Sequence, residues 1–290
     1  MTRDDDTPAN QLQWGDRTRS YIVHLPPGYV PGTPVPLVVS LHGGGGNAHS
    51  NRVQTGFDAE ADRSGFIVVH PDGTGERRPL LNALGRGHFH TWNAGSCCGY
   101  AMRNDVDDVG FIRAMLAELR RNYSIDPRRI YASGFSNGGM MSYRLACEMS
   151  DTFAAIGVVS AAQTAYECRP AQPVSVIHIH GSADQNVTLG GGIGAKALEK
   201  VPKPPVMEGV EFWARHNGCG APETSGEGKV LKTSYRGGRG SCEVEFHLIE
   251  GGGHAWPGGE QMLAILDKPS QELAATPLIW QFFAAHPRAA

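Results

Sequence analysis

Short apolar runs recur along the chain, and their length is typical of strands buried on both faces of a sheet. These runs cover residues 36–41, 66–70, 129–132, 154–160 and 173–179. Two further segments, 17–25 and 243–248, alternate polar and apolar positions, which is also a strand pattern. The alternation in residues 17–25 predicts an antiparallel strand near an edge of the sheet.

Segments with helical spacing lie between the predicted strands. In residues 50–64 apolar side chains recur every four residues, and another apolar stripe follows Asp107 and Asp108. One of these two aspartates is expected to cap the helix that follows them. Because helices alternate with strands, we predict an α/β fold with a mostly parallel, doubly wound sheet.

Neither an internal repeat nor a linker divides the sequence. The chain has 290 residues, 40% of them hydrophobic, which is enough for one large core. We expect a polar N-terminal tail over residues 1–16 and a single domain over residues 17–290. Residues 74–102 form a long irregular stretch, and such stretches inside compact domains are usually functional or crosslinked.

The charge of the chain argues against two classes of partner. Its formal net charge is −3, so we expect neither nucleic acid nor an anionic membrane surface as a partner. No apolar run approaches the ~20 residues that cross a bilayer. Residues 1–10 are polar and acidic, unlike a signal peptide.

The six cysteines lack zinc-type spacing, and their even number and paired placement predict disulfides. They are Cys97, Cys98, Cys147, Cys168, Cys219 and Cys242. We predict the bridges Cys147–Cys168 and Cys219–Cys242, whereas Cys97 and Cys98 form a vicinal bridge or stay free. Disulfides indicate a secreted or periplasmic protein whose leader is absent from this sequence. A cytosolic protein with reduced thiols is the alternative.

The clearest chemical signal lies in residues 131–140, where a buried strand gives way to a segment of helical spacing. Between them stands the pattern G-x-S-x-G, formed by Gly134, Ser136 and Gly138. This pattern is typical of a nucleophile elbow, whose sharp turn leaves no room for side chains at either glycine. The following helix would direct its N-terminal amides towards negative charge developing beside Ser136.

A second glycine-rich segment, HGGGGN, occupies residues 42–47 directly after the predicted strand 36–41. Consecutive glycines leave backbone amides accessible to an anion or a carbonyl oxygen. The segment lacks the Lys-Ser/Thr ending of a phosphate loop and the spacing of a dinucleotide-binding motif. An oxyanion loop therefore fits it better.

Two other strand ends supply an acid and a base. Asp184 follows the strand 173–179, and His254 lies in a glycine-rich loop after the strand 243–248. Ligand-facing groups of open α/β sheets lie beyond the carboxyl ends of strands. The chain order Ser136, Asp184, His254 is the order of the triad in α/β-hydrolases. His180 is the rival base, but its place on a strand end suits a role in bracing the loop.

Two aromatic and two histidine side chains are further candidates. Only residues 161–172 join the strands before Asp184, so there is no room for a cap domain and the site should be open. Trp92 and Trp256 are candidate substrate platforms, with core packing as the alternative. His88 and His90 have no third ligand nearby and are expected to be a surface pair rather than a metal site.

Together, these motifs resemble the polyhydroxybutyrate depolymerase and feruloyl esterase family, which includes esterases of the LpqC type and is close to carbohydrate esterase family 1. The motifs are HGGGGN (42–47), DDVGF (107–111), GFSNGGM (134–140), HGSAD (180–184) and GHAWPGG (253–259). The resemblance implies a secreted ester hydrolase of the α/β-hydrolase fold, without metal or organic cofactor. It also implies a triad of Ser136, Asp184 and His254, with oxyanion amides from Asn137 and Gly44.

The expected function is therefore serine-dependent hydrolysis of carboxylic esters in a catalytic domain over residues 17–290. The resemblance leaves three ester classes open: feruloyl esters, acetyl esters of plant polysaccharide, and hydroxybutyrate oligomers. Two other functions are considered. An acyltransferase of the mycolyltransferase kind needs an acceptor pocket that excludes water, and a catalytically idle polymer-binding relative would not need an intact triad.

Overall fold

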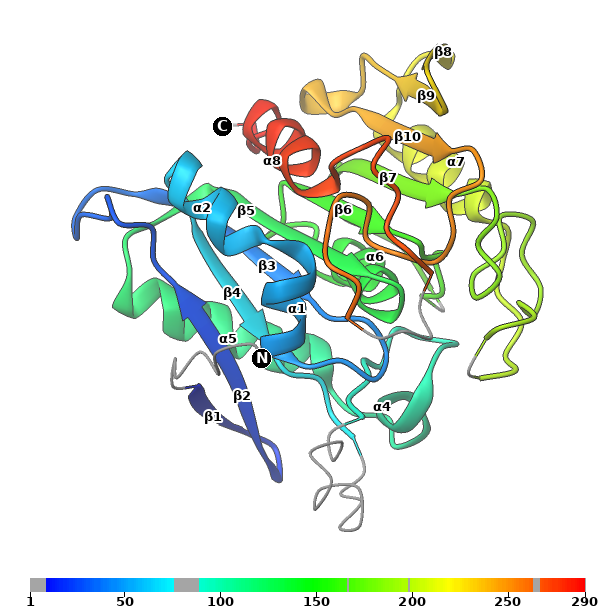
Figure 1. Cartoon of the computed structure of the whole chain (residues 1–290). Helices are drawn as coiled ribbons and strands as arrows, with labels where there is room; N and C mark the ends of the chain where they lie inside the picture. The colour runs from blue at the N-terminus through cyan, green and yellow to red at the C-terminus, as the bar shows by residue number, and fades with distance from the viewer. Residues whose placement is uncertain (1–8, 76–88, 166, 198, 263–266, 290) are drawn as a thin grey trace.

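A ten-stranded sheet runs through the computed structural model, which describes residues 9–75, 89–165, 167–197, 199–262 and 267–289 (Figure 1). The strands lie in the order β1–β2–β4–β3–β5–β6–β7–β10–β9–β8. Their bounds are β1 Asn10–Trp14, β2 Arg17–His24, β3 Val35–Leu41, β4 Ile67–Pro71, β5 Ile125–Phe135, β6 Ala155–Val159, β7 Ser175–Gly181, β8 Glu223–Glu227, β9 Val230–Tyr235 and β10 Val244–Ile249.

The helices follow individual strands along the chain. They are α1 Ala48–Thr55, α2 Phe57–Ser64, α4 Gly99–Arg103, α5 Asp108–Asn122, α6 Asn137–Glu148, α7 Val206–Asn217 and α8 Ala275–Ala285, with a 3₁₀ turn η1 at Arg239–Ser241. Asp107 caps α5 by accepting a hydrogen bond from the Gly110 amide, as expected of one of the two aspartates. Within the described ranges, no helix has the length and apolar character needed to cross a membrane.

The centre of the sheet is parallel and its edges are antiparallel. Strands β4, β3, β5, β6, β7 and β10 pair in parallel, whereas β1 and β2 on one side and β9 and β8 on the other pair antiparallel. The apolar runs of the sequence form the parallel strands, which confirms the predicted α/β class. Their carboxyl ends therefore meet at one edge of the sheet, where a site can collect residues from several strands.

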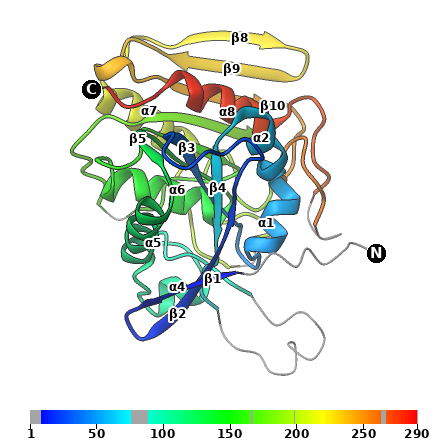
Figure 2. The same cartoon turned by 90° about the vertical axis from the view of Figure 1, so that its left-hand side faces the viewer.

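Helices cover both faces of the sheet, which is why the central strands are apolar on both faces. On β3, the side chains of Leu37, Val39 and Leu41 join the core cluster that includes α5, α6 and α7. Val38 points to the other face, into the cluster that includes α2 and α8. Figure 2 shows the same separation of α5 and α6 from α2. The predicted doubly wound arrangement is thus confirmed.

Three local features differ from the sequence expectation. Residues 50–64 form two helices because Gly56, with φ of 65°, ends α1 and begins α2. The polar segment expected as a tail over residues 1–16 contains β1, which pairs with β2. No strand is predicted between Cys219 and Cys242, but this segment contains the hairpin of β8 and β9, and β9 pairs with β10. These outer strands are polar because they cover the sheet edges and stay largely exposed.

The cysteines follow two of the three expected pairings. Cys147 on α6 is bonded to Cys168, and Cys97 is bonded to Cys98. The expected bridge between Cys219 and Cys242 is wrong, since both are free thiols in the structure. Cys219 Sγ lies 3.7 Å from the carbonyl oxygen of Cys242, whereas the side chain of Ser175 lies beside the Cys242 thiol. The η1 turn holds this segment without a bridge.

Candidate active site

Ser136 stands at the sharp turn between β5 and α6. Its backbone angles, φ 53° and ψ −120°, lie outside the regions that side chains usually allow. A Cβ atom on Gly134 would overlap the backbone of Gly138, and one on Gly138 would overlap the backbone of Leu41. Glycine is therefore required at both positions, as the elbow motif predicts, and the turn presents Ser136 at the carboxyl edge of the sheet.

The structure brings the three predicted triad residues together from the ends of three strands. His254 Nε2 lies 3.0 Å from Ser136 Oγ, and His254 Nδ1 lies 2.7 Å from Asp184 Oδ2. The side chains of His254 and Asp184 are almost fully buried. This geometry allows His254 to take the serine proton while Asp184 holds the imidazole by its other nitrogen.

The environment of Asp184 keeps it ionised. Burial alone would raise the pKa of Asp184, but the hydrogen bond and charge of His254 outweigh burial and lower it. Asp184 Oδ1 also accepts hydrogen bonds from the amides of Asn186 (2.8 Å) and Val187 (2.9 Å). A buried carboxylate with these donors is oriented and stays negative, as a partner for an imidazolium must be.

His180, the other candidate base, already makes a hydrogen bond outside the triad. Its Nε2 bonds to the carbonyl oxygen of Val187 at 2.8 Å and lies 3.7 Å from Asp184 Oδ2. Burial is the main reason why the pKa of His180 is lowered, so the ring is neutral. The contact with Val187 holds the loop that carries Asp184, which agrees with the bracing role expected from the sequence.

The predicted oxyanion residues adjoin each other. A Cβ atom on Gly44 would lie 3.7 Å from the Cβ of Asn137, so the glycine loop touches the start of α6. The Asn137 side chain bonds to the backbone of Trp92, with Trp92 N donating to Oδ1 at 2.7 Å and Nδ2 donating to Trp92 O at 3.1 Å. These bonds fix Asn137 beside Ser136, and its role in binding an oxyanion stays a prediction.

The platform role expected for the two tryptophans is wrong. Trp92 is fully buried, and its Nε1 donates to the carbonyl oxygen of His42 at 3.0 Å. Trp256 is also buried, and its Nε1 donates to Thr276 Oγ1 at 3.0 Å while its ring packs on Phe57. Both indoles belong to the scaffold because their positions in the fold cover them with other elements. Trp92 in particular joins the glycine loop to Asn137.

A cluster of polar side chains holds the glycine loop, residues 42–47, in place. Potential ligand atoms of His42, Asp72 and His90 lie within 4.8 Å of one another, but both ring nitrogens of His42 already have protein partners. Its Nδ1 donates to the carbonyl oxygen of Gly43 at 2.8 Å, and its Nε2 accepts from the Gly73 amide at 2.9 Å. We assign the cluster to holding the loop; His88, its expected neighbour, lies outside the described residues.

The pKa values of this cluster make its contribution to stability depend on pH. Burial lowers the pKa of His42 from 6.5 to about 4. Burial would raise the pKa of Asp72, but hydrogen bonds from His90, the Ala48 amide and Ser20 lower it to about 2. Between pH 6.5 and 4 the unfolded chain therefore binds more protons at His42. Between pH 3.8 and 2 it binds more protons at Asp72.

We expect stability to fall with falling pH in both windows. The His42 window is worth on the order of 3 kcal/mol and the Asp72 window about 2 kcal/mol. The free energy of unfolding in urea, measured from pH 7.5 to 4, should decrease more steeply for wild type than for His42→Gln. Equal pH slopes for the two proteins would contradict a neutral, buried His42.

Phe89 is an exposed aromatic residue beside the glycine loop that sequence reasoning missed. Its side chain is 50% exposed, and a Cβ atom on Gly45 would come within 2.7 Å of the ring. The Gly45 amide donates to the carbonyl oxygen of His90 at 2.8 Å, which joins the two segments. Residues 74–102 have no hydrophobic periodicity from which the exposure of Phe89 could be predicted. The only indication in the sequence that this stretch is functional was its unusual length.

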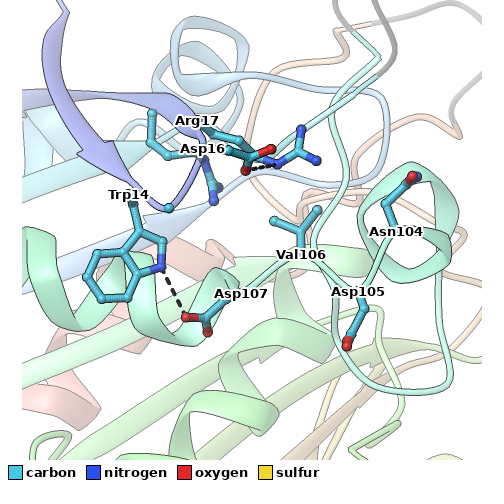
Figure 3. A pocket seen from close by; sticks show the side chains of 9 residues that line it. Trp14, Asp16, Arg17, Asn104, Asp105, Val106 and Asp107 are labelled. Atoms are coloured by element: carbon cyan, nitrogen blue, oxygen red, sulfur yellow. Dashed lines mark hydrogen bonds and ion pairs between the residues drawn. The ribbon is translucent and has the colours of Figure 1, made fainter.

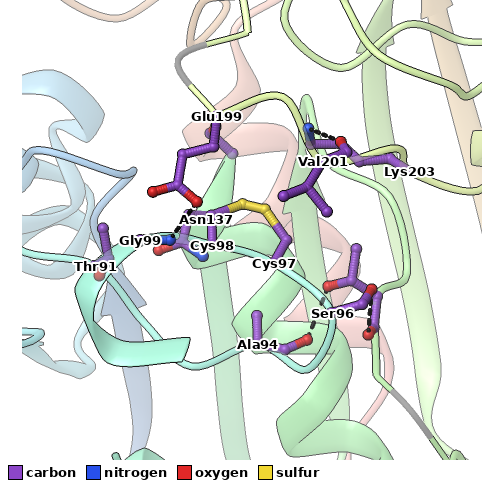
Figure 4. Close-up of a disulfide and its surroundings, with 12 residues drawn as sticks. Thr91, Ala94, Ser96, Cys97, Cys98, Gly99, Asn137, Glu199, Val201 and Lys203 are labelled. Carbon is purple, nitrogen blue, oxygen red and sulfur yellow. Dashed lines mark hydrogen bonds between the residues drawn. A yellow bond between two sulfur atoms is a disulfide. The ribbon is translucent and has the colours of Figure 1, made fainter. Parts of the chain in front are cut away.

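The vicinal cysteines lie near Asn137, the first residue of α6 (Figure 4). Figure 4 shows the Cys97–Cys98 bond close to Asn137 and to the segment that carries Glu199. Glu199 accepts hydrogen bonds from the Gly99 amide at 2.8 Å and from Arg103 at 2.6 Å. The carboxylate of Glu199 therefore joins α4 to the loop that follows Asp184.

Comparisons with known proteins show which family the chain resembles. A family profile described as "Esterase PHB depolymerase" matches residues 19–205. The putative esterase NocK of Nocardia uniformis subsp. tsuyamanensis is 33% identical over 277 residues, 88% of this chain and 76% of that protein. Feruloyl esterase B of Piromyces equi is 32% identical over 245 residues, 82% of this chain and 42% of that protein.

A solved structure shares the fold. The acetyl xylan esterase from Aspergillus awamori matches with a TM-score of 0.62 at 16% identity, over 86% of this chain and 94% of that chain. At this level of identity, the likeness shows the fold, which is that of the α/β-hydrolases.

Proposed function

Because the chain belongs to the esterase PHB depolymerase family and is a carboxylic ester hydrolase, we propose that Ser136, His254 and Asp184 are its catalytic triad. The observation that carries this proposal is the continuous hydrogen-bonded series from Ser136 Oγ through His254 to Asp184. The series lies at the carboxyl edge of a sheet with helices on both faces, which is where this fold places its chemistry.

The reaction follows from these contacts. Ser136 Oγ attacks the ester carbonyl carbon as His254 Nε2 takes its proton, and the amides of Asn137 and Gly44 bind the oxyanion. The tetrahedral intermediate collapses to an acyl-enzyme when the imidazolium returns the proton to the leaving alkoxide oxygen. Water then attacks the acyl carbon, with His254 again as base, and releases the acid and free Ser136. Asp184 stays ionised throughout.

For the substrate, we propose esters of hydroxycinnamic acids such as ferulate. Phe89 offers a half-exposed ring next to the glycine loop, and an aromatic acyl group can stack on it. Feruloyl esterase B is among the relatives. Among the described residues no helix lies between β6 and β7, which fits an open site that a polymer-bound ester can reach.

The experiment compares kcat/KM for methyl ferulate, a hydroxybutyrate trimer and acetylated xylan. We expect methyl ferulate to be the best substrate. Phe89→Ala should lower kcat/KM for methyl ferulate by about tenfold, because the variant loses one aromatic contact with the acyl group. The turnover of p-nitrophenyl acetate, which has no aromatic acyl group, should change little. Leu231→Ala is the matched control, because Leu231 is similarly exposed but lies on β9.

Other outcomes point to the alternative functions. Faster turnover of the hydroxybutyrate trimer, with no effect of Phe89→Ala, would overturn the hydroxycinnamoyl assignment in favour of a depolymerase. Acyl transfer to an added alcohol in preference to water would indicate an acyltransferase. A protein that neither hydrolyses any of these esters nor reacts with a fluorophosphonate would be a catalytically idle relative.

We also propose that residues 17–290 act as one catalytic domain in an oxidising compartment, secreted or periplasmic. The Cys147–Cys168 bridge supports this, since disulfides persist mainly in such compartments. Free-thiol titration of the denatured, unreduced protein should then detect the thiols of Cys219 and Cys242 alone.

A further inference from the structure

A cavity of about 430 Å³ lies outside the proposed triad, between the β1–β2 turn and the segment that joins α4 to α5 (Figure 3). Trp14, Asp16 and Arg17 line it from the turn, and Asn104 and Asp105 line it from the α4–α5 segment. None of these side chains has a part in the chemistry described above. The cavity therefore requires its own explanation.

One of the lining residues, Arg19, has a buried guanidinium group whose nitrogens are not all hydrogen-bonded. Arg19 is 2% exposed, and its Nη2 donates to Asp108 Oδ1 at 2.7 Å and to the carbonyl oxygen of Asp72 at 3.0 Å. Its Nε and Nη1 have no partner among the described residues. Both nitrogens are buried, and Arg19 Cζ lies 4.0 Å from the centroid of the Phe111 ring. Buried donors without acceptors are costly, so an acceptor that gains access to them from the cavity would be stabilised.

An aromatic ring forms one side of the cavity and is held in place. Trp14 Nε1 donates to Asp107 Oδ2 at 3.0 Å, and Asp107 in turn caps α5. The orientation of the indole is thus set by its hydrogen bond to the residue that caps α5. A fixed aromatic ring is a good surface for stacking a flat apolar face.

The remaining lining groups indicate the chemistry of the ligand. Asp16 and Asp105 accept hydrogen bonds, Arg17 and Arg19 donate them, and Asn104 does both. Asp107 adds further negative charge, so the lining carboxylates outnumber the lining guanidinium groups and an anionic ligand is disfavoured. A neutral sugar ring has donor and acceptor hydroxyls together with apolar C–H faces, and it matches this set.

The topology puts this cavity at the same edge of the sheet as the triad. Strand β2 runs antiparallel to β4, with Tyr21 opposite Pro71, so the start of β2 lies at the carboxyl end of β4. Asp108, the partner of Arg19, also accepts from the Asn93 amide at 2.7 Å. Asn93 follows Trp92, whose amide holds Asn137. The cavity and Ser136 therefore lie at the same edge of the sheet and are linked by these contacts.

We propose that this cavity is a sugar-binding site for an uncharged residue of the polysaccharide that carries the scissile ester. The polysaccharide assignment rests on the proposed function, but binding of a sugar at the cavity can be measured without any ester hydrolysis. The site would hold the polymer while its ester group reacts at Ser136.

The first test measures binding of unesterified xylohexaose to the wild-type enzyme by calorimetry, with polygalacturonate as the anionic comparison. We expect xylohexaose to bind, polygalacturonate not to bind, and Trp14→Ala to weaken xylohexaose binding by about tenfold. Tyr29→Ala is the matched control, because Tyr29 is also half-buried but packs against Tyr123. Asp105→Asn is a second variant in case Trp14→Ala does not fold, and it too should weaken binding.

The second test measures catalysis. Trp14→Ala should lower kcat/KM for feruloylated xylan by about tenfold and leave methyl ferulate turnover unchanged within about twofold. Absence of xylohexaose binding to wild type, or equal binding by wild type, Trp14→Ala and Asp105→Asn, would overturn the proposal and leave water as the partner of Arg19. Xylohexaose binding by a protein inactive on methyl ferulate would support the cavity while contradicting the proposed function.

Discussion

Ser136→Ala is expected to lower kcat for ester hydrolysis by on the order of 10⁴–10⁶-fold while leaving the fold intact. The reason is that the members of a triad act as a unit: without Oγ no acyl-enzyme forms, and His254 has no proton to take. The alanine keeps the Cβ that the turn already accommodates, so the thermal unfolding midpoint should change little. Initial rates with p-nitrophenyl acetate and methyl ferulate, together with labelling by a fluorophosphonate, measure the effect.

Ser225→Ala is the matched control for this variant. Ser225 is exposed on β8, at the far edge of the sheet from the elbow, so its rate should equal that of wild type. Retention by Ser136→Ala of a tenth or more of the wild-type rate would show that another group is the nucleophile. If Ser136→Ala lost both its activity and its thermal unfolding transition, the loss of rate would reflect unfolding. In that case, peptide mapping of the fluorophosphonate-labelled wild-type protein would identify the nucleophilic serine.

Asp184→Asn is expected to lower kcat by roughly 10⁴-fold. The amide can donate a hydrogen bond to His254 Nδ1, which would place the imidazole proton on Nε2 and prevent that nitrogen from accepting the serine proton. The variant also removes the negative charge that stabilises the imidazolium. Steady-state rates with methyl ferulate at pH 8 measure the effect.

Asp267→Asn offers a stringent control, because Asp267 contacts the same histidine by a different atom. Its Oδ2 accepts from the backbone amide of His254 at 2.8 Å, and its Oδ1 pairs with Lys196. We expect a decrease of less than about tenfold, since the imidazole keeps its partner. A mild effect of Asp184→Asn combined with a severe effect of Asp267→Asn would reverse the assignment of the acid.

The cysteines show that their separation along the sequence does not determine which pairs form disulfides. Cys147–Cys168 and Cys219–Cys242 have similar spacing along the chain, yet the structure bonds the first pair and leaves the second free. A bridge requires the two sulfur atoms to face each other, and spacing says nothing about that. The Cys242 thiol lies beside Ser175 on β7, a contact that exists only because β10 pairs with β7.

The sequence by itself determined the strand and helix pattern, the α/β class and the position of the elbow at Ser136. These features are local: buried parallel strands need continuous apolar runs, and the turn at Ser136 needs glycine on both sides. The order of Ser136, Asp184 and His254 could also be read from the sequence, because each of them follows a strand. Carboxyl ends of parallel strands meet at one edge, so the three were expected to converge.

Only the tertiary structure decided which side chains are covered. Trp92 and Trp256 are buried whereas Phe89 and Trp14 are accessible, and nothing in their immediate sequence distinguishes the two pairs. The polar strands β1, β8 and β9 likewise form because they complete the edges of a sheet built from distant segments. Burial, thiol pairing and the cavity at Arg19 all depend on contacts between residues far apart in the chain, which no local pattern encodes.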